Sequence, residues 1–495
     1  MRAAVGFLAL GLIASAAAMG QGLRIVDQRL STPVHGPLAA MRLPDRSGAW
    51  LMVPTRRDEQ RQFDFYAVDR RGLTPQLSLT MPEAALYYDL GAVPDGQALF
   101  FLAPEGVYRD AGQGADLVAR TTSLYRLPGS PAFLRDDFAK DLTGDGLADL
   151  LVQDFQQLRV FVQQSDGAFT PVADLPVPAR RRGSFDDVVY TNYPVYSGDA
   201  TGDGRPDLLV RRDFTLLVFE AMAEGFLNEP IEIALPMPLS GNSWAETNKA
   251  NEDSSDQSDF QFTWMLALED IAGDGIVDIL TETDRAEGLF DRMTRYALYP
   301  GRLSGGRLRF SADSSGELSV EGFGAQAELV DLDGNGAKDL GIGGVRLGLR
   351  RVVAALLTGA TTLKLRIHAI TEAERFAEEP LVERDLSIDF DLSRGNSTAP
   401  LVAAADFTGD GLKDLMVSDG DDEVKLYRNT GTGFDRSARV FDVDVPRNGQ
   451  DFLAEDLNGD GRADLALPFD RLGADGEDNR TRLILLVSEP EDGES

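Results

Sequence analysis

The sequence predicts an all-β fold, a β-propeller of seven or eight four-stranded blades, with eight favoured. A nine-residue acidic pattern occurs six times along the chain, and an apolar run follows each copy. Two degenerate copies precede these six, so eight units of about 60 residues cover the chain, the size of a four-stranded blade with its loops. Between the copies, short segments such as 158–169 and 424–434 alternate apolar and polar residues and turn at glycines, as β-hairpins do.

Composition excludes several functional classes. The 495 residues are 43% hydrophobic, which is enough for a substantial core. Asp and Glu number 81 against 48 Lys and Arg, and the net charge of -33 disfavours a nucleic acid or an anionic membrane as partner. There is no cysteine, which excludes disulfides, thiolate metal sites and a cysteine nucleophile. Only His35 and His368 are available for histidine chemistry.

The first residues have the layout of a secretory signal peptide. Arg2 precedes an apolar run that ends in three alanines, and cleavage is expected after Ala18. The alternative is a membrane anchor, but the run is short for a span of roughly 20 residues. We therefore expect residues 1–18 to be removed and residues 19–488 to form a single propeller, periplasmic or extracellular, without a membrane span.

Two degenerate units come first in the expected propeller. They start at Asp45 (DRSGAWLMV) and at Asp89 (DLGAVPDGQALFFL). Both keep a glycine turn and an apolar strand but lack the set of carboxylates. These units are therefore expected to hold no metal.

The six intact copies follow the pattern D-x-[D/N/T]-G-[D/N]-G-x-x-D. They occupy residues 141–149, 199–207, 270–278, 331–339, 406–414 and 456–464, and only the third copy departs from the pattern, with Ala272 at its third position. Six chance copies of such a pattern are not credible. The motif therefore defines the repeat.

A loop of this kind can wrap a calcium ion, which takes six to eight oxygen ligands. Side chains at positions 1, 3, 5 and 9 and the backbone carbonyl of position 7 can supply oxygens, and glycines at positions 4 and 6 allow the positive φ that a tight turn needs. Three carboxylates within nine residues also repel one another unless a cation neutralises them. The candidate ligands are Asp141, Thr143, Asp145, Leu147, Asp149, Asp199, Thr201, Asp203, Arg205, Asp207, Asp270, Asp274, Ile276, Asp278, Asp331, Asp333, Asn335, Ala337, Asp339, Asp406, Thr408, Asp410, Leu412, Asp414, Asp456, Asn458, Asp460, Arg462 and Asp464.

Up to six calcium ions (Ca²⁺) are therefore expected, and the alternative is a metal-free Asp/Gly turn. The loop at 270–278 should bind most weakly, because Ala272 offers no side-chain oxygen. The loops are not EF-hands, which need a bidentate Glu at position 12. That position holds Val152, Val210, Thr281, Ile342, Val417 or Leu467.

Two stretches interrupt the series of repeats, and two terminal strands are expected to close the ring of blades. Residues 241–261 are polar and are expected to be a mobile insertion, whereas residues 346–357 have the apolar spacing of a helix packed on the ring. The strand-like segment 23–30 should pair with the last strand, 483–487, which closes the ring and removes exposed sheet edges. Residues 489–495 form an acidic tail.

The repeats resemble FG-GAP or VCBS-type repeats, the units of integrin α-subunit-like β-propellers. The resemblance covers nearly the whole chain and is specific at the six acidic loops. It implies one structural calcium ion per intact loop, in the connection between adjacent strands of a blade. The chain departs from integrin α-subunits in having no inserted adhesion domain, no membrane span and two metal-free units, so an integrin-like ligand is not implied.

These observations favour an exported, non-enzymatic module for interaction, adhesion or scaffolding. The partner would be a protein or a polysaccharide bound on a face of the ring, and the protein would be a monomer. No residue is singled out as catalytic, and calcium is the only cofactor expected. The alternative is a calcium-dependent propeller enzyme of the polysaccharide lyase type, in which the metal acidifies a proton beside a uronate carboxylate and a basic side chain removes it. A quinone-dependent dehydrogenase is less favoured, because the chain has only three Trp.

Overall fold

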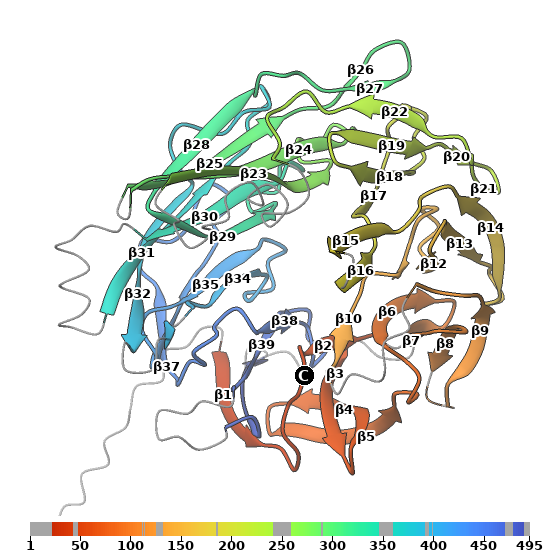
Figure 1. Ribbon diagram of the computed structural model, residues 1–495. Helices are drawn as coiled ribbons and strands as arrows, with labels where there is room; N and C mark the ends of the chain where they lie inside the picture. Colours follow the sequence, from red (N-terminus) through yellow and green to blue (C-terminus); the bar gives the residue numbers. More distant parts are fainter. Residues whose placement is uncertain are drawn as a thin grey trace, which may run out of the picture.

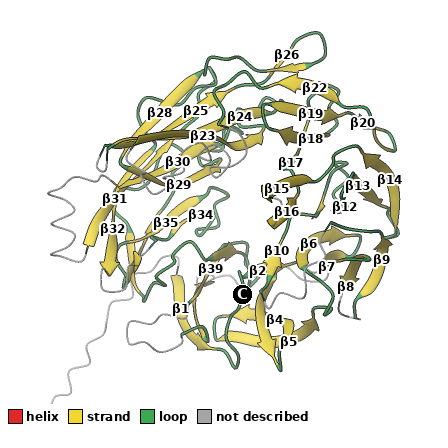
Figure 2. Ribbon diagram, in the orientation of Figure 1, coloured by secondary structure: helices red, strands yellow, loops and turns green. Residues whose placement is uncertain are grey.

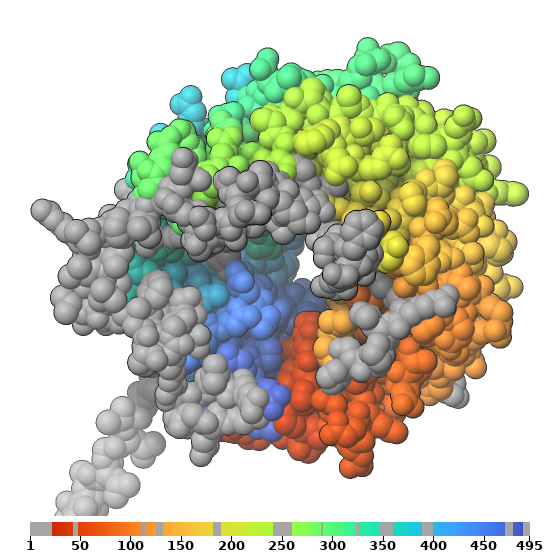
Figure 3. All heavy atoms as spheres, viewed as in Figure 1, coloured from red at the N-terminus to blue at the C-terminus, as the bar shows by residue number. Residues whose placement is uncertain are grey.

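The structure is a computed structural model that describes residues 22–42, 48–110, 112, 114–124, 132–184, 187–240, 259–288, 291–345, 360–391, 396–397, 399–470 and 479–489. These residues form an all-β, eight-bladed propeller (Figures 1 and 2), which confirms the predicted fold class and the larger of the two blade numbers. The blades surround an opening that is still visible when all heavy atoms are drawn (Figure 3). The signal peptide, the helix expected at 346–357 and residues 490–495 lie outside the described residues.

Blades 1 and 2 are built from the degenerate units. Each has four antiparallel strands in chain order, and blade 2 gains a short fifth strand that runs parallel to its first. Blade 1 contains β2 (Ala39–Met41), β3 (Trp50–Arg57), β4 (Gln60–Asp69) and β5 (Gly72–Thr80). Blade 2 contains β6 (Tyr87–Val93), β7 (Gly96–Ala103), β8 (Gly106–Asp110), β9 (Asp116–Arg120) and the added β10 (Leu134–Arg135).

Blades 3 and 4 are the first two with an intact acidic motif, and two small hairpins decorate them. Blade 3 contains β11 (Ala139–Lys140), β12 (Asp149–Gln153), β13 (Leu158–Gln163) and β14 (Phe169–Leu175), followed by the hairpin β15 (Arg180–Ser184) and β16 (Asp187–Thr191). Blade 4 contains β17 (Val195–Gly198), β18 (Asp207–Arg212), β19 (Thr215–Phe219) and β22 (Ile231–Ala234), with the hairpin β20 (Ala221–Met222) and β21 (Gly225–Phe226) inserted.

Blades 5 and 6 follow, and blade 5 contains the longest described strand, with 11 residues. Blade 5 contains β23 (Asp259–Glu269), β24 (Asp278–Glu287), β25 (Arg292–Tyr299) and β28 (Gly316–Glu321), with the hairpin β26 (Arg302–Leu303) and β27 (Leu308–Arg309). Blade 6 contains β29 (Phe323–Val330), β30 (Asp339–Val345), β31 (Ala360–His368), β32 (Val382–Asp391) and β33 (Asn396–Ser397). Residues 259–261, which the sequence assigned to the insertion, begin β23 instead, because they continue its pairing with β24. The rest of that insertion is not described.

Blades 7 and 8 complete the ring. Blade 7 contains β34 (Val402–Ala405), β35 (Asp414–Ser418), β36 (Glu423–Tyr427) and β37 (Arg439–Asp442). Blade 8 contains β38 (Leu453–Glu455), β39 (Asp464–Pro468), β40 (Arg482–Glu489) and the N-terminal strand β1 (Gly22–Arg29).

The two ends of the propeller share one sheet, as the sequence predicted. β1 pairs antiparallel with β40 along its whole length, with Ile25 opposite Leu486. The Arg482 guanidinium donates to Asp27 at 2.8 Å and forms an ion pair with Asp444 of the preceding blade at 2.7 Å. The first and last parts of the chain therefore hold the ring closed together.

The core lies between neighbouring blades. Both faces of most second strands are covered, so runs such as Asp149–Gln153 and Asp464–Pro468 are buried at every position. One apolar cluster joins Leu209 of blade 4 to Ile279 of blade 5, and another joins Leu280 of blade 5 to Leu340 of blade 6. No helix of the described residues is long and apolar enough to cross a membrane.

Candidate metal centres

Each acidic motif lies at the same place in its blade. In blades 3 to 8 it connects the first strand to the second, and its ninth residue begins the second strand, as Asp149 begins β12. The two glycines of every motif have φ between 75° and 88°. This is the left-handed region in which glycine is favoured. The predicted position of the loops and the predicted role of their glycines are therefore confirmed.

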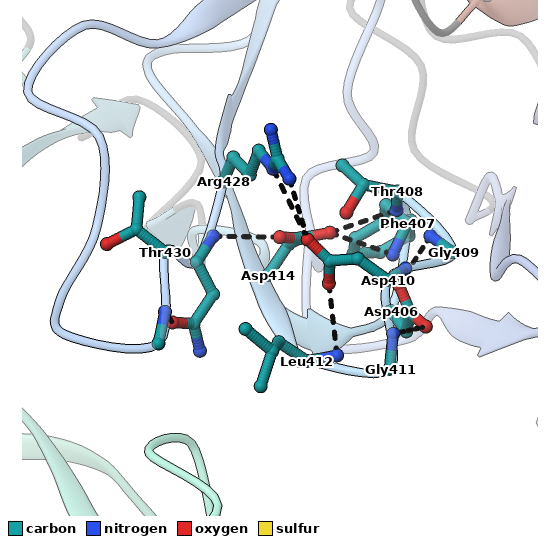
Figure 4. A network of polar contacts seen from close by, with 12 residues as sticks. Asp406, Phe407, Thr408, Gly409, Asp410, Gly411, Leu412, Asp414, Arg428 and Thr430 are labelled. Atoms are coloured by element: carbon teal, nitrogen blue, oxygen red, sulfur yellow. Dashed lines mark hydrogen bonds and ion pairs between the residues drawn. The ribbon is translucent and has the colours of Figure 1, made fainter.

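The first Asp of each motif organises the loop backbone. In the fifth loop, Asp406 accepts the Gly409 N–H on one carboxylate oxygen at 2.6 Å and the Gly411 N–H on the other at 2.8 Å (Figure 4). The same pair of bonds occurs in the other five loops. Both oxygens therefore face N–H groups, which gives the loop the same curvature in every blade.

The ninth residue is a fully buried Asp in all six loops. One of its oxygens accepts the N–H of the second loop residue at 2.8–3.1 Å. In five loops the other oxygen accepts a backbone N–H at or just beyond the end of the third strand. Burial raises the pKa of this carboxyl to about 6 in five loops, those of Asp149, Asp278, Asp339, Asp414 and Asp464.

The fourth loop differs from the others. The second oxygen of Asp339, Oδ1, is buried and has no hydrogen-bond partner among the described residues. One carboxylate oxygen each from Asp331, Asp333 and Asp339 lies within 4.8 Å of the others, the one such group in the described part of the chain. Hard oxygen donors of this kind suit a divalent cation such as Ca²⁺. The residues of this loop therefore fit the predicted ion.

The third position supplies different groups to the other loops. In the first loop the Thr143 hydroxyl is buried, and no described residue pairs with it. A metal ion is one partner that would satisfy such an oxygen, since leaving a buried polar group unpaired costs roughly 1–3 kcal/mol. In the third loop Ala272 contributes only its backbone N–H, which donates to Asp278 at 2.8 Å. Its weaker calcium binding stays a prediction.

Arginines neutralise the fifth position of two loops. Arg205 donates to Asp203 through its Nε at 3.0 Å and lowers the pKa of that carboxyl. Arg428, at the end of the third strand of blade 7, donates to Asp410 at 3.0 Å (Figure 4). The sequence assigned Arg205 only a backbone role and gave no sign of Arg428, which lies 18 residues from its partner. A bound cation would compete with both guanidiniums.

The sixth loop is the most fully hydrogen-bonded. Asp464 accepts from the Ser488 N–H at 2.7 Å, from the Ser488 hydroxyl at 2.8 Å and from the Asn458 amide nitrogen at 3.2 Å. The same hydroxyl lies 2.9 Å from Asp460, and because it has one proton it donates to only one of these two carboxylates at a time. Protein donors therefore reach both oxygens of Asp464, whereas one oxygen of Asp339 in the fourth loop has none in the described structure.

The seventh residues also lie in the loops as predicted. In every loop the N–H of this residue donates to the side-chain oxygen of the fifth residue at 2.7–3.1 Å. Ligation through their carbonyl oxygens stays a prediction.

The degenerate unit at Asp89 has no acidic loop. Asp89 lies within β6, is 2% exposed, and accepts the Ala139 N–H at 3.0 Å and the Arg135 guanidinium at 3.3 Å. Only Pro94 and Asp95 separate β6 from β7. The other degenerate start, Asp45, lies outside the described residues.

His368 occupies a structural position. It ends β31, is 3% exposed, and its Nδ1 lies 2.9 Å from the Ala377 carbonyl oxygen. Burial lowers its pKa, which favours the neutral ring. His35 lies outside the named strands, and its backbone N–H donates to Pro54.

The model of the FG-GAP-like repeat matches residues 141–210 and 406–467. Each segment runs from one acidic loop through the next and into the strand that follows it. The chain therefore carries FG-GAP-like repeats, as the resemblance implied. No curated protein matches the chain.

Three solved structures align with the chain at low similarity. A chain of the crystal structure of BBS1N in complex with ARL6DN, soaked with lead, is 11% identical with a TM-score of 0.36, and 95% of this chain and 99% of that chain are covered. A protein from Lactobacillus plantarum is 14% identical with a TM-score of 0.31, covering 86% and 98%. The V. cholerae biofilm matrix protein Bap1 is 13% identical with a TM-score of 0.25, covering 96% and 90%. Similarity at this level carries no argument about function.

Proposed function

We propose that this propeller of FG-GAP-like repeats is an exported calcium-binding protein that acts as a non-enzymatic interaction module. Calcium would hold the acidic loops, and a protein or polysaccharide would bind on a face of the ring. The observation that supports the metal most directly is the fourth loop, in which one oxygen each of Asp331, Asp333 and Asp339 lies within 4.8 Å of the others and Asp339 keeps a buried oxygen unpaired.

The loops are placed so that an ion in one would support its neighbours. The Lys338 N–H of the fourth loop donates to the Ile271 carbonyl of the third at 2.8 Å, and the Ala463 N–H of the sixth donates to the Asp406 carbonyl of the fifth at 2.7 Å. The sixth loop is joined in turn to blade 1 by the bond from Ala49 to Asp456 at 3.1 Å. Ordering one loop therefore restrains the next blade, and the role proposed for calcium is structural.

Thermal unfolding in chelator and in calcium tests the metal part of the proposal. Extracellular-type sites bind at roughly 10⁻⁴–10⁻³ M, and one site bound only in the folded state adds about 2.7 kcal/mol at a hundredfold excess over its dissociation constant. We expect millimolar calcium to raise the melting temperature by many degrees, and equal magnesium to do less because Mg²⁺ demands tighter octahedral geometry. Equal melting temperatures in EGTA and calcium would contradict the proposal.

The interaction role needs a separate test. Purified mature protein immobilised in calcium should retain a specific protein or polysaccharide from cell-envelope and culture-medium fractions. Substitutions in the exposed loops of one ring face should abolish this capture while the calcium-dependent melting shift is retained. Failure to capture any partner would count against the interaction module and leave the calcium sites unaffected. N-terminal sequencing of protein from the same fractions checks export, with Met19 expected as the first residue.

A further inference from the structure

A cleft of about 760 Å³ lies between blades 3 and 4, beside two of the acidic loops. This volume is within the range of about 300–1,000 Å³ that is typical of small-ligand sites. Its walls come from the first acidic loop, from Arg205 of the second, from the turn between β13 and β14, and from the hairpin β20–β21. Neither the motif nor the family match assigns a role to this cleft.

The hairpin wall is held in place by close packing. Gly225 has φ of 112°, and a Cβ at this position would lie 2.8 Å from the Cβ of Val172 on β14. Phe226 beside it is buried, and its ring belongs to the apolar cluster between blades 3 and 4. The cleft is therefore formed before any ligand arrives, which reduces the entropy that binding must overcome.

The polar lining consists of side chains that suit hydroxyl groups. Gln164, Ser165 and Thr170 are exposed and offer amide and hydroxyl groups, while Glu224 offers a carboxylate acceptor. At the back of the cleft, Gln163 is 1% exposed and its amide nitrogen donates to two backbone carbonyls, at 2.8 and 3.0 Å. Its amide oxygen is also buried, and the amide is held against Ala92 of blade 2, so Gln163 closes this wall without offering a group to a ligand.

Apolar surface lies between these polar groups. Pro171, Val172 and Ala223 line the cleft, and Met222 beside them is 47% exposed. Small apolar patches alternating with hydrogen-bonding groups match the two kinds of surface on a sugar ring, its C–H face and its hydroxyl edge.

We infer that this cleft binds a neutral, hydroxyl-rich saccharide of a few rings. The net charge of -33 disfavours a polyanion, and the lining of the cleft has one cationic side chain, Arg205, against two carboxylates, Asp145 and Glu224. This inference rests on the proposed function as an interaction module, for which it names a site and a ligand class.

Saturation-transfer NMR and calorimetry on the full mature chain in calcium test the inference. The probes are maltotriose, cellotriose and triacetylchitotriose, with trigalacturonate as the charged comparison. We expect at least one neutral trisaccharide to bind, and the double variant Gln164→Ala/Thr170→Ala to weaken it at least tenfold. Both positions are exposed, so the fold should be retained, which the melting temperature checks.

Thr430→Ala is the matched control. Asn429 in blade 7 donates its N–H to Asp414 as Gln163 does to Asp149, so Thr430 is the counterpart of Gln164 in a blade without this cleft. The control should bind the saccharide as the unchanged protein does. If Thr430→Ala weakened saccharide binding as much as the double variant does, the assignment of the binding site to this cleft would be overturned.

Two further outcomes would overturn the inference, and both can be separated from failure of the proposed function. Binding of trigalacturonate alone would reject the neutral ligand class. Absence of binding by all four probes at millimolar concentration would reject the saccharide site. If the calcium-dependent melting shift and a captured partner are nevertheless present, the interaction module stands and only the cleft is rejected.

Discussion

Blades 1 and 2 join their neighbours differently from blades 3 to 8. The later blades use nine-residue acidic loops whose Asp side chains bind backbone N–H groups. The first two blades have no such loop in the described residues, and an aromatic cluster lies between them. Phe63 of blade 1 is fully buried, and its ring centroid lies 4.7 Å from that of Tyr88 and 6.0 Å from that of Phe101, both in blade 2.

The hydrogen bonding of buried acidic residues also differs between blade 1 and blade 6. In blade 1, Asp64 is 3% exposed and accepts from Arg57 at 2.8 Å, Thr55 at 2.8 Å and Ser78 at 2.7 Å. Such an acid has its own cation and needs no metal. In blade 6, by contrast, Asp339 keeps a buried oxygen unpaired. Apolar clusters therefore join blades in both regions, and blades 3 to 8 add acidic loops, one of which keeps a buried carboxylate oxygen unpaired.

The largest effect is expected from the aromatic cluster. Phe63→Ala should lower the free energy of unfolding by about 3–5 kcal/mol, because it leaves a cavity between blades 1 and 2. The loss should be the same in EGTA and in calcium, measured by urea unfolding. A loss that depended on calcium would break the comparison between the two regions.

The next effect is expected in the fourth loop. Asp339→Asn should remove about 2.7 kcal/mol of stabilisation at a hundredfold excess of calcium, if that ion no longer binds. In EGTA the substitution should reduce the free energy of unfolding much less than in calcium, because it also removes a buried and unpaired charge. Melting temperatures in the two conditions give the measurement.

Asp64→Asn is the matched control, a buried carboxylate in a blade without an acidic loop. It should destabilise the protein equally with and without calcium, because it breaks the ion pair with Arg57. A calcium-dependent loss in this control, or a calcium-independent one in Asp339→Asn, would show that the two kinds of blade are not distinct.

A smaller effect is expected from restoring the third loop. Ala272→Asp places a carboxylate where the fourth loop has Asp333, and it should tighten calcium binding by roughly tenfold, which is about 1.4 kcal/mol. Calorimetric titration of the variant against the unchanged protein measures this. In chelator the added carboxylate should slightly destabilise the protein, since like charges repel. An unchanged calcium affinity of the variant would mean that the third position does not contribute a ligand.

A further effect concerns pH and an acidic residue away from the loops. Burial, with help from Asp284, raises the pKa of Glu282 on β24 from 4.5 to about 7. The folded state therefore holds this proton more tightly than the unfolded state, and stability falls as pH rises from about 4.5 to about 7. Glu282→Gln does not titrate, so it should be more stable than the unchanged protein at pH 8 and lose that advantage near pH 4.5. Urea unfolding at both pH values measures the difference, and a constant difference would contradict it.

Much of the fold could be predicted from the sequence because each repeat is a local unit. The alternation between apolar and polar residues predicted the hairpin of β13 and β14, and the number of repeat units predicted eight blades. The boundary at 259–261 was missed, because a polar segment can extend a strand when its partner β24 is long enough to pair with it. Asp89 was also hard to place, since its partners Arg135 and Ala139 lie far along the chain.

The sequence by itself determined the shape of each acidic loop, and the tertiary structure decided the electrostatic state of each one. The first Asp accepts hydrogen bonds from glycine N–H groups that are at most five residues away. The nine-residue pattern is therefore sufficient to specify these bonds and the glycine conformations. Whether the ninth Asp keeps an unpaired oxygen depends on the third strand, which supplies Ser488 to Asp464 but no N–H to the corresponding oxygen of Asp339. Hydrogen bonds act over about 3 Å, so only the folded blade determines which donors reach each loop and which buried carboxylate oxygen stays unpaired.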